Sequence, residues 1–288
     1  MISYLIWRTA SFIWQRLPLV WGYALAGAMA DVTYYLWPRG RRWAKVAMAR
    51  VLGQGASPSQ VSRLARSSFR NYAKYMVDFL RFPRLKREDI ERLVRCDDWE
   101  GLDQALAEGK GAIFIGLHMG NWDLAGAAMA QRRYPVSAIA EKLPSPRINE
   151  AVQRARQEMG VRVVPMESAA RSILQVLRRN GILALLIDRP APDNGVPVNL
   201  FGTPTRFPGG AATLALKTGA QVVVGALVRL PDNTFLGLVE HLLPGHSSGD
   251  WSQDLQALTQ RIVSSLEEWV RQYPDQWYVF RPLWVEEP

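Results

Sequence analysis

The chain has 288 residues, of which 48% are hydrophobic, and this is enough to form one large α/β domain or two small ones. Its formal net charge of +9 comes mostly from arginines spread along the whole chain without a block of like charge, so we expect no nucleic-acid partner. Cys96 is the only cysteine, which excludes a disulfide framework and a cysteine-based metal site and favours a reducing, cytoplasmic setting.

The first stretch of the chain is rich in Ile, Leu, Trp and Tyr and ends in a basic cluster at residues 38–42. Residues 17–37 have nearly the length of a membrane span, but two glycines and Asp31 weaken that interpretation. We therefore favour helices that lie in the membrane interface, which suits a basic chain with eleven tryptophans. We predict a membrane-associating helical region over residues 1–42, either peripheral or single-pass through residues 17–37, followed by a single α/β domain over residues 43–288.

A long amphipathic helix is predicted after this region. Ser57, Pro58 and Gln60 form a helix-start pattern, with a capping serine, a proline at the first position and a glutamine at the third. Apolar residues then recur at helical spacing as far as Leu80, and arginines occupy the other faces. The apolar stripe predicts a core-facing helix.

The most informative stretch is residues 111–123, GAIFIGLHMGNWD. The apolar run predicts a strand buried on both faces, and the residues from Asp123 predict a helix, so His118 stands where strand becomes helix. Asp123 can fold back on the imidazole, which would then act as a general base, and the amides of Gly120 and Asn121 can stabilise an oxyanion. The plain alternative is a structural histidine that closes a turn.

Alternating strands and helices fill the rest of the chain and predict a mixed, mainly parallel sheet flanked by helices, an α/β fold. An edge strand is expected over residues 234–240. The other strands are expected over residues 136–140, 162–165, 182–187 and 221–227, and the helices over residues 145–160, 169–180, 208–218 and 254–273.

Further candidate site residues follow the ends of these strands. Glu141 and Lys142 come directly after one strand, and Arg156 on the next helix can reach back to pair with Glu141, although a surface ion pair explains it equally well. Asp188 and Arg189 follow another strand, where a carboxylate and a guanidinium can position a lipid hydroxyl and bind a phosphate.

One more candidate lies beyond the Pro/Gly-rich loop that ends at Gly202. Arg206 comes just before Pro208, which opens a helix whose first amides suit an anion. Helix capping explains the glycines after Pro208 equally well.

These residues together resemble a known family. The segment from His118 to Asp123 is similar to the H-x4-D motif of the glycerolipid and lipid A acyltransferase superfamily. Other segments resemble its bacterial branch, which contains the lipid A lauroyl/myristoyl transferases and the phosphatidylinositol mannoside acyltransferases: residues 41–53, Glu141-Lys-Leu143, Arg156, Ile187-Asp-Arg189, residues 198–202 and 207–220, and Pro274-Asp-Gln-Trp277.

The resemblance implies an O-acyltransferase that moves a fatty acyl group from acyl-CoA or acyl carrier protein to a sugar hydroxyl of a glycolipid at the cytoplasmic face of the membrane. His118 would be the base and Asp123 its partner, and Asp188 is our substitute for the distal acidic residue that assists the mannoside type. Lys142 is closer to the mannoside type, because the lipid A type usually carries arginine there.

We expect no cofactor and no metal, with membrane lipids and the acyl donor as partners of a monomer. Two other functions stay open. One is a catalytically silent membrane lipid-binding protein, and the other is a thioesterase that uses water in place of a lipid hydroxyl.

Overall fold

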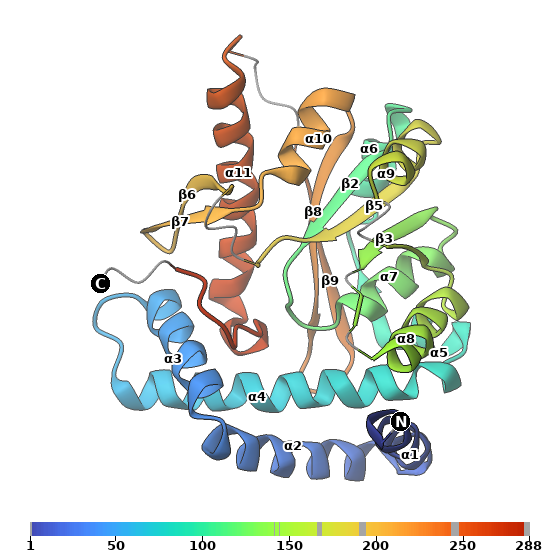
Figure 1. The fold of residues 1–288 in the computed structure, drawn as a ribbon, viewed down its shortest axis with the longest axis vertical. Coiled ribbons are helices and arrows are strands. Elements are labelled where there is room, and N and C mark those ends of the chain that lie inside the picture. The colour runs from blue at the N-terminus through green and yellow to red at the C-terminus, as the bar shows by residue number, and fades with distance from the viewer. Residues whose placement is uncertain are drawn as a thin grey trace.

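The computed structural model describes residues 2–140, 142–143, 145–165, 169–189, 194–242 and 248–284. A seven-stranded sheet with strand order β1-β9-β8-β2-β5-β3-β4 forms its centre (Figure 1). The sheet strands are β1 (Val94–Cys96), β2 (Ala112–Gly116), β3 (Val136–Ala140), β4 (Arg162–Pro165), β5 (Ile182–Leu186), β8 (Gln221–Arg229) and β9 (Phe235–Leu242). All neighbours are parallel except β8 and β9, which confirms the predicted mixed, mainly parallel sheet.

Strand β9 departs from the prediction for residues 234–240. It does pair antiparallel with β8, but β1 pairs with its other side, so the edge of the sheet is β1 and the prediction of an edge strand is wrong. Three residues are too few for an alternating pattern to identify β1 from sequence. The region expected to be a loop also contains a hairpin, β6 (Val196–Leu200) and β7 (Thr203–Phe207), whose two turn residues, Phe201 and Gly202, both have positive φ.

Helices cover both faces of the sheet. On β2, Ile113 and Ile115 pack in one apolar cluster with residues of α10 and α11, whereas Ala112 and Phe114 pack in another with residues of α6 and α7. Strand β2 is therefore buried on both faces, as its continuous apolar sequence predicts. The helices on this part of the chain are α5 (Arg87–Leu93), α6 (Glu100–Ala107), α7 (Trp122–Gln131), α8 (Pro146–Glu158), α9 (Ala169–Arg178), α10 (Gly210–Thr218) and α11 (Trp251–Gln272), with the 3-10 turns η1 (Phe82–Arg84) and η3 (Pro274–Gln276).

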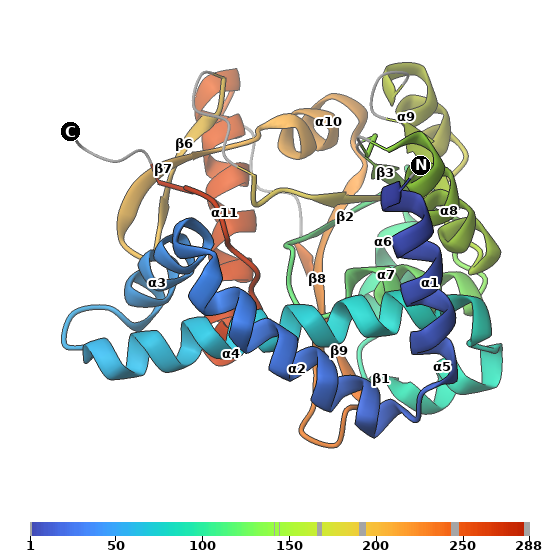
Figure 2. The same cartoon turned by 60° about the horizontal axis from the view of Figure 1, so that its bottom comes forward.

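The N-terminal helices pack together along one end of the sheet (Figures 1 and 2), and α2, α3 and α4 share its apolar core. They are α1 (Ile2–Arg16), α2 (Leu19–Leu36), α3 (Pro38–Leu52) and α4 (Pro58–Arg81). Helix α4 begins with the predicted capping box between Ser57 and Gln60 and lies between α2 and the sheet. The predicted boundary between residues 42 and 43 falls inside α3, and attachment of this region to a membrane stays a prediction.

Within the described ranges, no helix is both long enough and apolar enough to cross a membrane. That finding includes α2, so it gives no support to a single pass through residues 17–37.

Candidate active site

Two strand ends bring His118 and Asp188 together. Strands β2 and β5 are parallel neighbours in which Gly116 pairs with Leu186, and each candidate side chain stands two residues beyond its member of that pair. His118 Nδ1 lies 2.6 Å from Asp188 Oδ1, and the backbone N–H of His118 donates to Asp188 Oδ2 at 2.9 Å. The sheet register therefore places a carboxylate directly on the imidazole.

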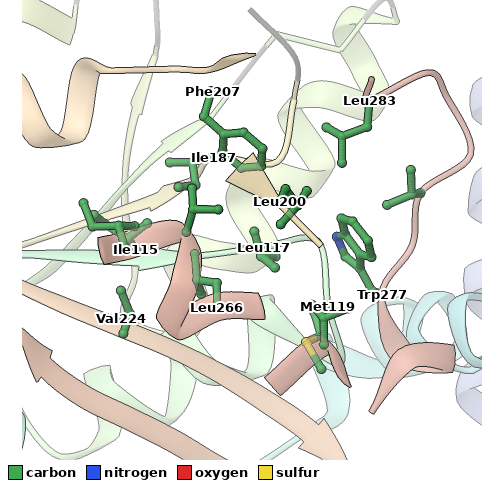
Figure 3. Close-up of a cluster of buried hydrophobic side chains, with 14 of the residues drawn as sticks. Ile115, Leu117, Met119, Ile187, Leu200, Phe207, Val224, Leu266, Trp277 and Leu283 are labelled. Carbon is green, nitrogen blue, oxygen red and sulfur yellow. The ribbon is translucent and has the colours of Figure 1, made fainter. Parts of the chain in front are cut away.

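Trp277 of the C-terminal segment fixes the carboxylate of Asp188. The Asp188 side chain is only 2% exposed, and the indole Nε1–H of Trp277 donates to Oδ2 at 3.1 Å. Trp277 lies in a buried apolar cluster with Leu117 and Leu200, which fixes its ring (Figure 3). Burial acts to raise the pKa of the Asp188 carboxyl, but the neighbouring His118 and the hydrogen bonds outweigh it and hold that pKa below its usual value.

The second ring nitrogen of His118, Nε2, is left without a partner among the described residues. The side chain is 24% exposed, and within the described part of the chain no group bonds Nε2. The ionised carboxylate of Asp188 favours the tautomer with the proton on Nδ1, which leaves the Nε2 lone pair available. The Trp122 ring lies edge-on at 5.1 Å between centroids and borders the imidazole. This is the arrangement of a general base with an orienting carboxylate.

Asp123 does not orient His118, so that expectation is wrong. Its carboxylate accepts from Tyr75 Oη–H at 2.6 Å and from Arg156 Nε–H at 2.6 Å, and the Asp123 side chain is 5% exposed. The reason is geometric, because Asp123 is the second residue of α7 and faces α4 and α8, whereas the imidazole faces β5. Arg156 is thus paired with Asp123, and its expected partner Glu141 lies outside the described residues.

Asp123 contributes to the site indirectly, through Tyr75 and Trp122. The ring of Tyr75, which it holds, packs on Trp122 at 4.0 Å between centroids, and Trp122 borders His118. Burial and the carboxylate of Asp123 raise the pKa of Tyr75 well above its usual value, so its hydroxyl remains a proton donor to that carboxylate. The Arg156–Asp123–Tyr75 chain therefore positions one wall of the site.

The loop between His118 and α7 is pinned by its backbone. The Gly120 N–H donates to Gln276 O at 2.9 Å and the Asn121 N–H to Leu227 O at 2.8 Å, so the expectation that these amides stabilise an oxyanion is wrong. Gly120 has φ of 58°, and a Cβ there would lie 1.9 Å from Leu227 O, which explains the glycine. The Asn121 side chain caps α7 through Leu124 N–H at 3.0 Å.

A buried polar cluster supports this loop, and sequence reasoning missed it. Asp78 accepts from Asn121 Nδ2 at 3.1 Å, pairs with Arg229 and accepts from the hydroxyl of Tyr23. Gln276 joins it to the C-terminal segment, because its side chain exchanges hydrogen bonds of 2.7 and 2.8 Å with the backbone of Arg229. These residues come from distant segments, so no local pattern could have identified them.

The remaining predicted residues lie around this centre. Lys142 is exposed beyond the end of β3, and Arg189 follows Asp188 and is half-buried. Arg206 lies on β7 and donates to Gly195 O at 2.8 Å, beside its own hairpin. The binding roles expected for these three residues stay predictions.

Comparison with known proteins places the chain among bacterial lipid enzymes. The family model described as bacterial lipid A biosynthesis acyltransferase matches residues 2–286. A phosphatidylinositol mannoside acyltransferase of Mycolicibacterium smegmatis is 30% identical over 83% of this chain and 77% of its own length. A protein of the same name from Mycobacterium tuberculosis is also 30% identical, over 83% of this chain and 75% of its own.

Proposed function

Because the chain belongs to the bacterial lipid A biosynthesis acyltransferase family and is an acyltransferase, we propose that it moves a fatty acyl group from a thioester to a sugar hydroxyl of a glycolipid. The donor is acyl-CoA or acyl carrier protein, and no resident cofactor takes part. One observation carries the proposal: Asp188 occupies Nδ1 of His118 while Nε2 remains open at the carboxyl edge of the sheet.

The chemistry follows from that arrangement. Nε2 of His118 accepts the proton of the acceptor hydroxyl as its oxygen attacks the thioester carbonyl, and the carboxylate of Asp188 stabilises the imidazolium that forms. The tetrahedral intermediate then collapses, the carbon–sulfur bond breaks, and the thiolate takes the proton back from His118. Because a thiolate is already a good leaving group, no covalent acyl-enzyme is needed.

The oxyanion needs donors other than those first expected. Among the described residues, the amides of Trp122 and Asp123, the first two of α7, have no backbone acceptor. The first amides of a helix lack partners within the helix and carry the positive end of its dipole. We assign these two N–H groups to the developing negative charge.

The acceptor we favour is a phosphatidylinositol mannoside-like glycolipid. Both relatives described above bear that name, and Lys142 with Leu143 follows the mannoside-type pattern. A lipid A-like acceptor is the alternative. We further propose that α1 and α2 attach the enzyme to the cytoplasmic face of the membrane, which would bring its active site to a lipid substrate.

Thioester turnover with and without a glycolipid acceptor tests the proposal. We expect thiol release that depends on added phosphatidylinositol mannoside, with the acylated lipid seen by mass spectrometry, and His118→Ala as the negative control. Release without acceptor would identify a hydrolase. No release with either donor and either acceptor, while lipid still binds, would identify a silent lipid-binding protein.

A further inference from the structure

A basic cavity of about 550 Å³ lies between α2, α3 and α4. Its volume is in the range of small-molecule sites. Two tyrosines and two serines line it together with five cationic side chains: Tyr34, Tyr35, Ser62, Ser67, Arg41, Lys45, Arg63, Arg66 and Arg70. The cavity is therefore polar and strongly positive.

Most of this charge is not neutralised by the protein. Asp31 is the one carboxylate, among the described residues, that is paired here; it accepts from Arg66 Nε and Nη2, both at 2.7 Å, and from Arg70 Nε at 2.7 Å. Hydrogen bonds from the two guanidiniums hold the pKa of Asp31 well below its usual range. In the described part of the chain, Lys45 and Arg63 have no ion-pair partner.

The side chains around the cavity are also held in place. The guanidinium of Arg41 stacks over the Tyr34 ring at 5.7 Å, and that of Arg66 stacks over the Tyr35 ring at 5.9 Å. Gathered cations repel one another, and a bound anion with several acceptor oxygens relieves that repulsion. A phosphate group supplies both the charge and the oxygens.

The cavity is distinct from the catalytic centre. Tyr75, which bonds Asp123, marks the level of that centre on α4. The residues of α4 that line the cavity, Ser62 to Arg70, stand thirteen to five residues earlier on the same helix, which corresponds to about 20 to 8 Å along its axis.

The exposed apolar face of α2 indicates that the phosphate belongs to a lipid. Trp21, Met29, Val32 and Leu36 are 70%, 55%, 57% and 78% exposed and follow one face of the helix. Tyr35, 59% exposed, adjoins this face and also lines the cavity. A helix lying with this face among lipid acyl chains holds the cavity at the depth of the headgroups.

We propose that this cavity binds the phosphate headgroup of an anionic phospholipid. The inference rests on the proposed attachment of α1 and α2 to the membrane, but not on acyl transfer. Headgroup binding would add selectivity for anionic lipid to the apolar contact of α2 and would fix the orientation of the enzyme on the surface.

Vesicle co-sedimentation of the full-length protein tests this, with phosphatidylcholine alone and with added phosphatidylglycerol. The cavity variant is Lys45→Gln with Arg63→Gln. The matched control is Arg178→Gln with Arg179→Gln, which removes the same charge from exposed positions around the end of α9, away from α3 in both views (Figures 1 and 2).

We expect the wild type to prefer anionic vesicles by about tenfold or more, the cavity variant to lose about tenfold of that preference, and the control to stay within about twofold. Unchanged melting temperatures establish that the variants fold. Equal losses in both variants would mean diffuse electrostatic attraction and would overturn the site. The site would also be overturned if Lys45 and Arg63 bound soluble glycerol phosphate or acidic carrier protein but did not bind vesicles.

The two proposals fail in different ways. If the wild type binds neither kind of vesicle, the membrane attachment is wrong and the headgroup site falls with it. If it binds both kinds equally, only the headgroup site is wrong. Acyl transfer to a detergent-dispersed acceptor is measured separately and depends on neither result.

Discussion

Replacement of Asp188 by asparagine tests the proposed base most directly. The carboxylate receives three donors: the imidazole Nδ1–H on Oδ1, and the His118 backbone N–H and the Trp277 Nε1–H on Oδ2. An asparagine has one oxygen and one NH₂ group, so it can satisfy only one side of this arrangement. We expect the amide oxygen to face the His118 backbone N–H and the Trp277 Nε1–H, because the opposite orientation would turn the amide NH₂ group towards these two donors.

The NH₂ group of the introduced amide then faces Nδ1 of His118 and forces that nitrogen to become an acceptor. The ring proton moves to Nε2, which can no longer take a proton from the acceptor hydroxyl. Where a base histidine is held in the wrong tautomer in this way, turnover falls by about 10⁴-fold. We expect a fall of about 10³- to 10⁴-fold in kcat, which is about 4 to 5.5 kcal/mol of transition-state stabilisation, with little change in KM for the glycolipid.

The assay is thiol release at saturating donor and acceptor, with circular dichroism to establish folding. The matched control is Asp123→Asn, which makes the same chemical change beside Arg156 and Tyr75. That variant weakens a buried ion pair, so we expect a stability loss of up to about 3 kcal/mol and turnover within about tenfold of the wild type. Turnover above about a tenth of wild type in Asp188→Asn, or a greater loss in Asp123→Asn, would refute the assignment.

His118→Ala should lower acyl transfer by about 10²- to 10⁴-fold in a protein that still folds, with a somewhat lower melting temperature because the buried carboxylate of Asp188 loses its Nδ1–H donor. A rate above about a tenth of wild type would remove the base from the mechanism. Gly120→Ala should prevent stable folding, because its Cβ would meet Leu227 O at 1.9 Å. The control is Gly27→Ala, where a Cβ in mid-helix meets open space, and it should be neutral or stabilising by up to about 1 kcal/mol. Thermal unfolding of the two variants compares their stabilities. Because the pKa of Asp188 is lowered on folding, its contribution to stability is present above the unfolded value of about 3.9 and lost as pH falls through the lower folded value. Urea titrations should therefore show the gap between wild type and Asp188→Asn narrowing below about pH 4, and a constant gap would contradict this.

Much of the fold is predictable from local pattern. The apolar runs of β2, β5 and β8, separated by helical segments, indicate a parallel sheet, and the match over residues 2–286 confirms the family that the motifs suggest. Strand β1 and the β6–β7 hairpin were not predictable in the same way. A three-residue strand carries no period, and each five-residue strand of the hairpin contains a proline, which argues against a strand prediction.

The site residues also differ in whether local sequence could identify them. His118 was identifiable because it stands where a buried strand ends, which is a local property. Asp188 was also a candidate, as a carboxylate after another strand and as the substitute for the distal acidic residue, but its pairing with His118 was not predicted. Strand order decides which neighbouring strand end delivers a carboxylate, and that order depends on packing across the whole sheet. Trp277 belonged to a recognised C-terminal pattern, yet only the folded chain shows that it holds Asp188.

The spacing of five residues between His118 and Asp123 has a structural explanation of its own. The backbone from Gly120 to Asn121 is tied to β8 and to the C-terminal segment, so the imidazole and the first turn of α7 have a fixed relation. Asp123 then projects from α7 into α4 and α8, where it draws Tyr75 against Trp122. Because Trp122 borders the imidazole, a carboxylate at this spacing shapes the wall beside the base, while the carboxylate that orients the base comes from the end of β5. The motif and the sheet order thus supply two different parts of one site, and neither substitutes for the other.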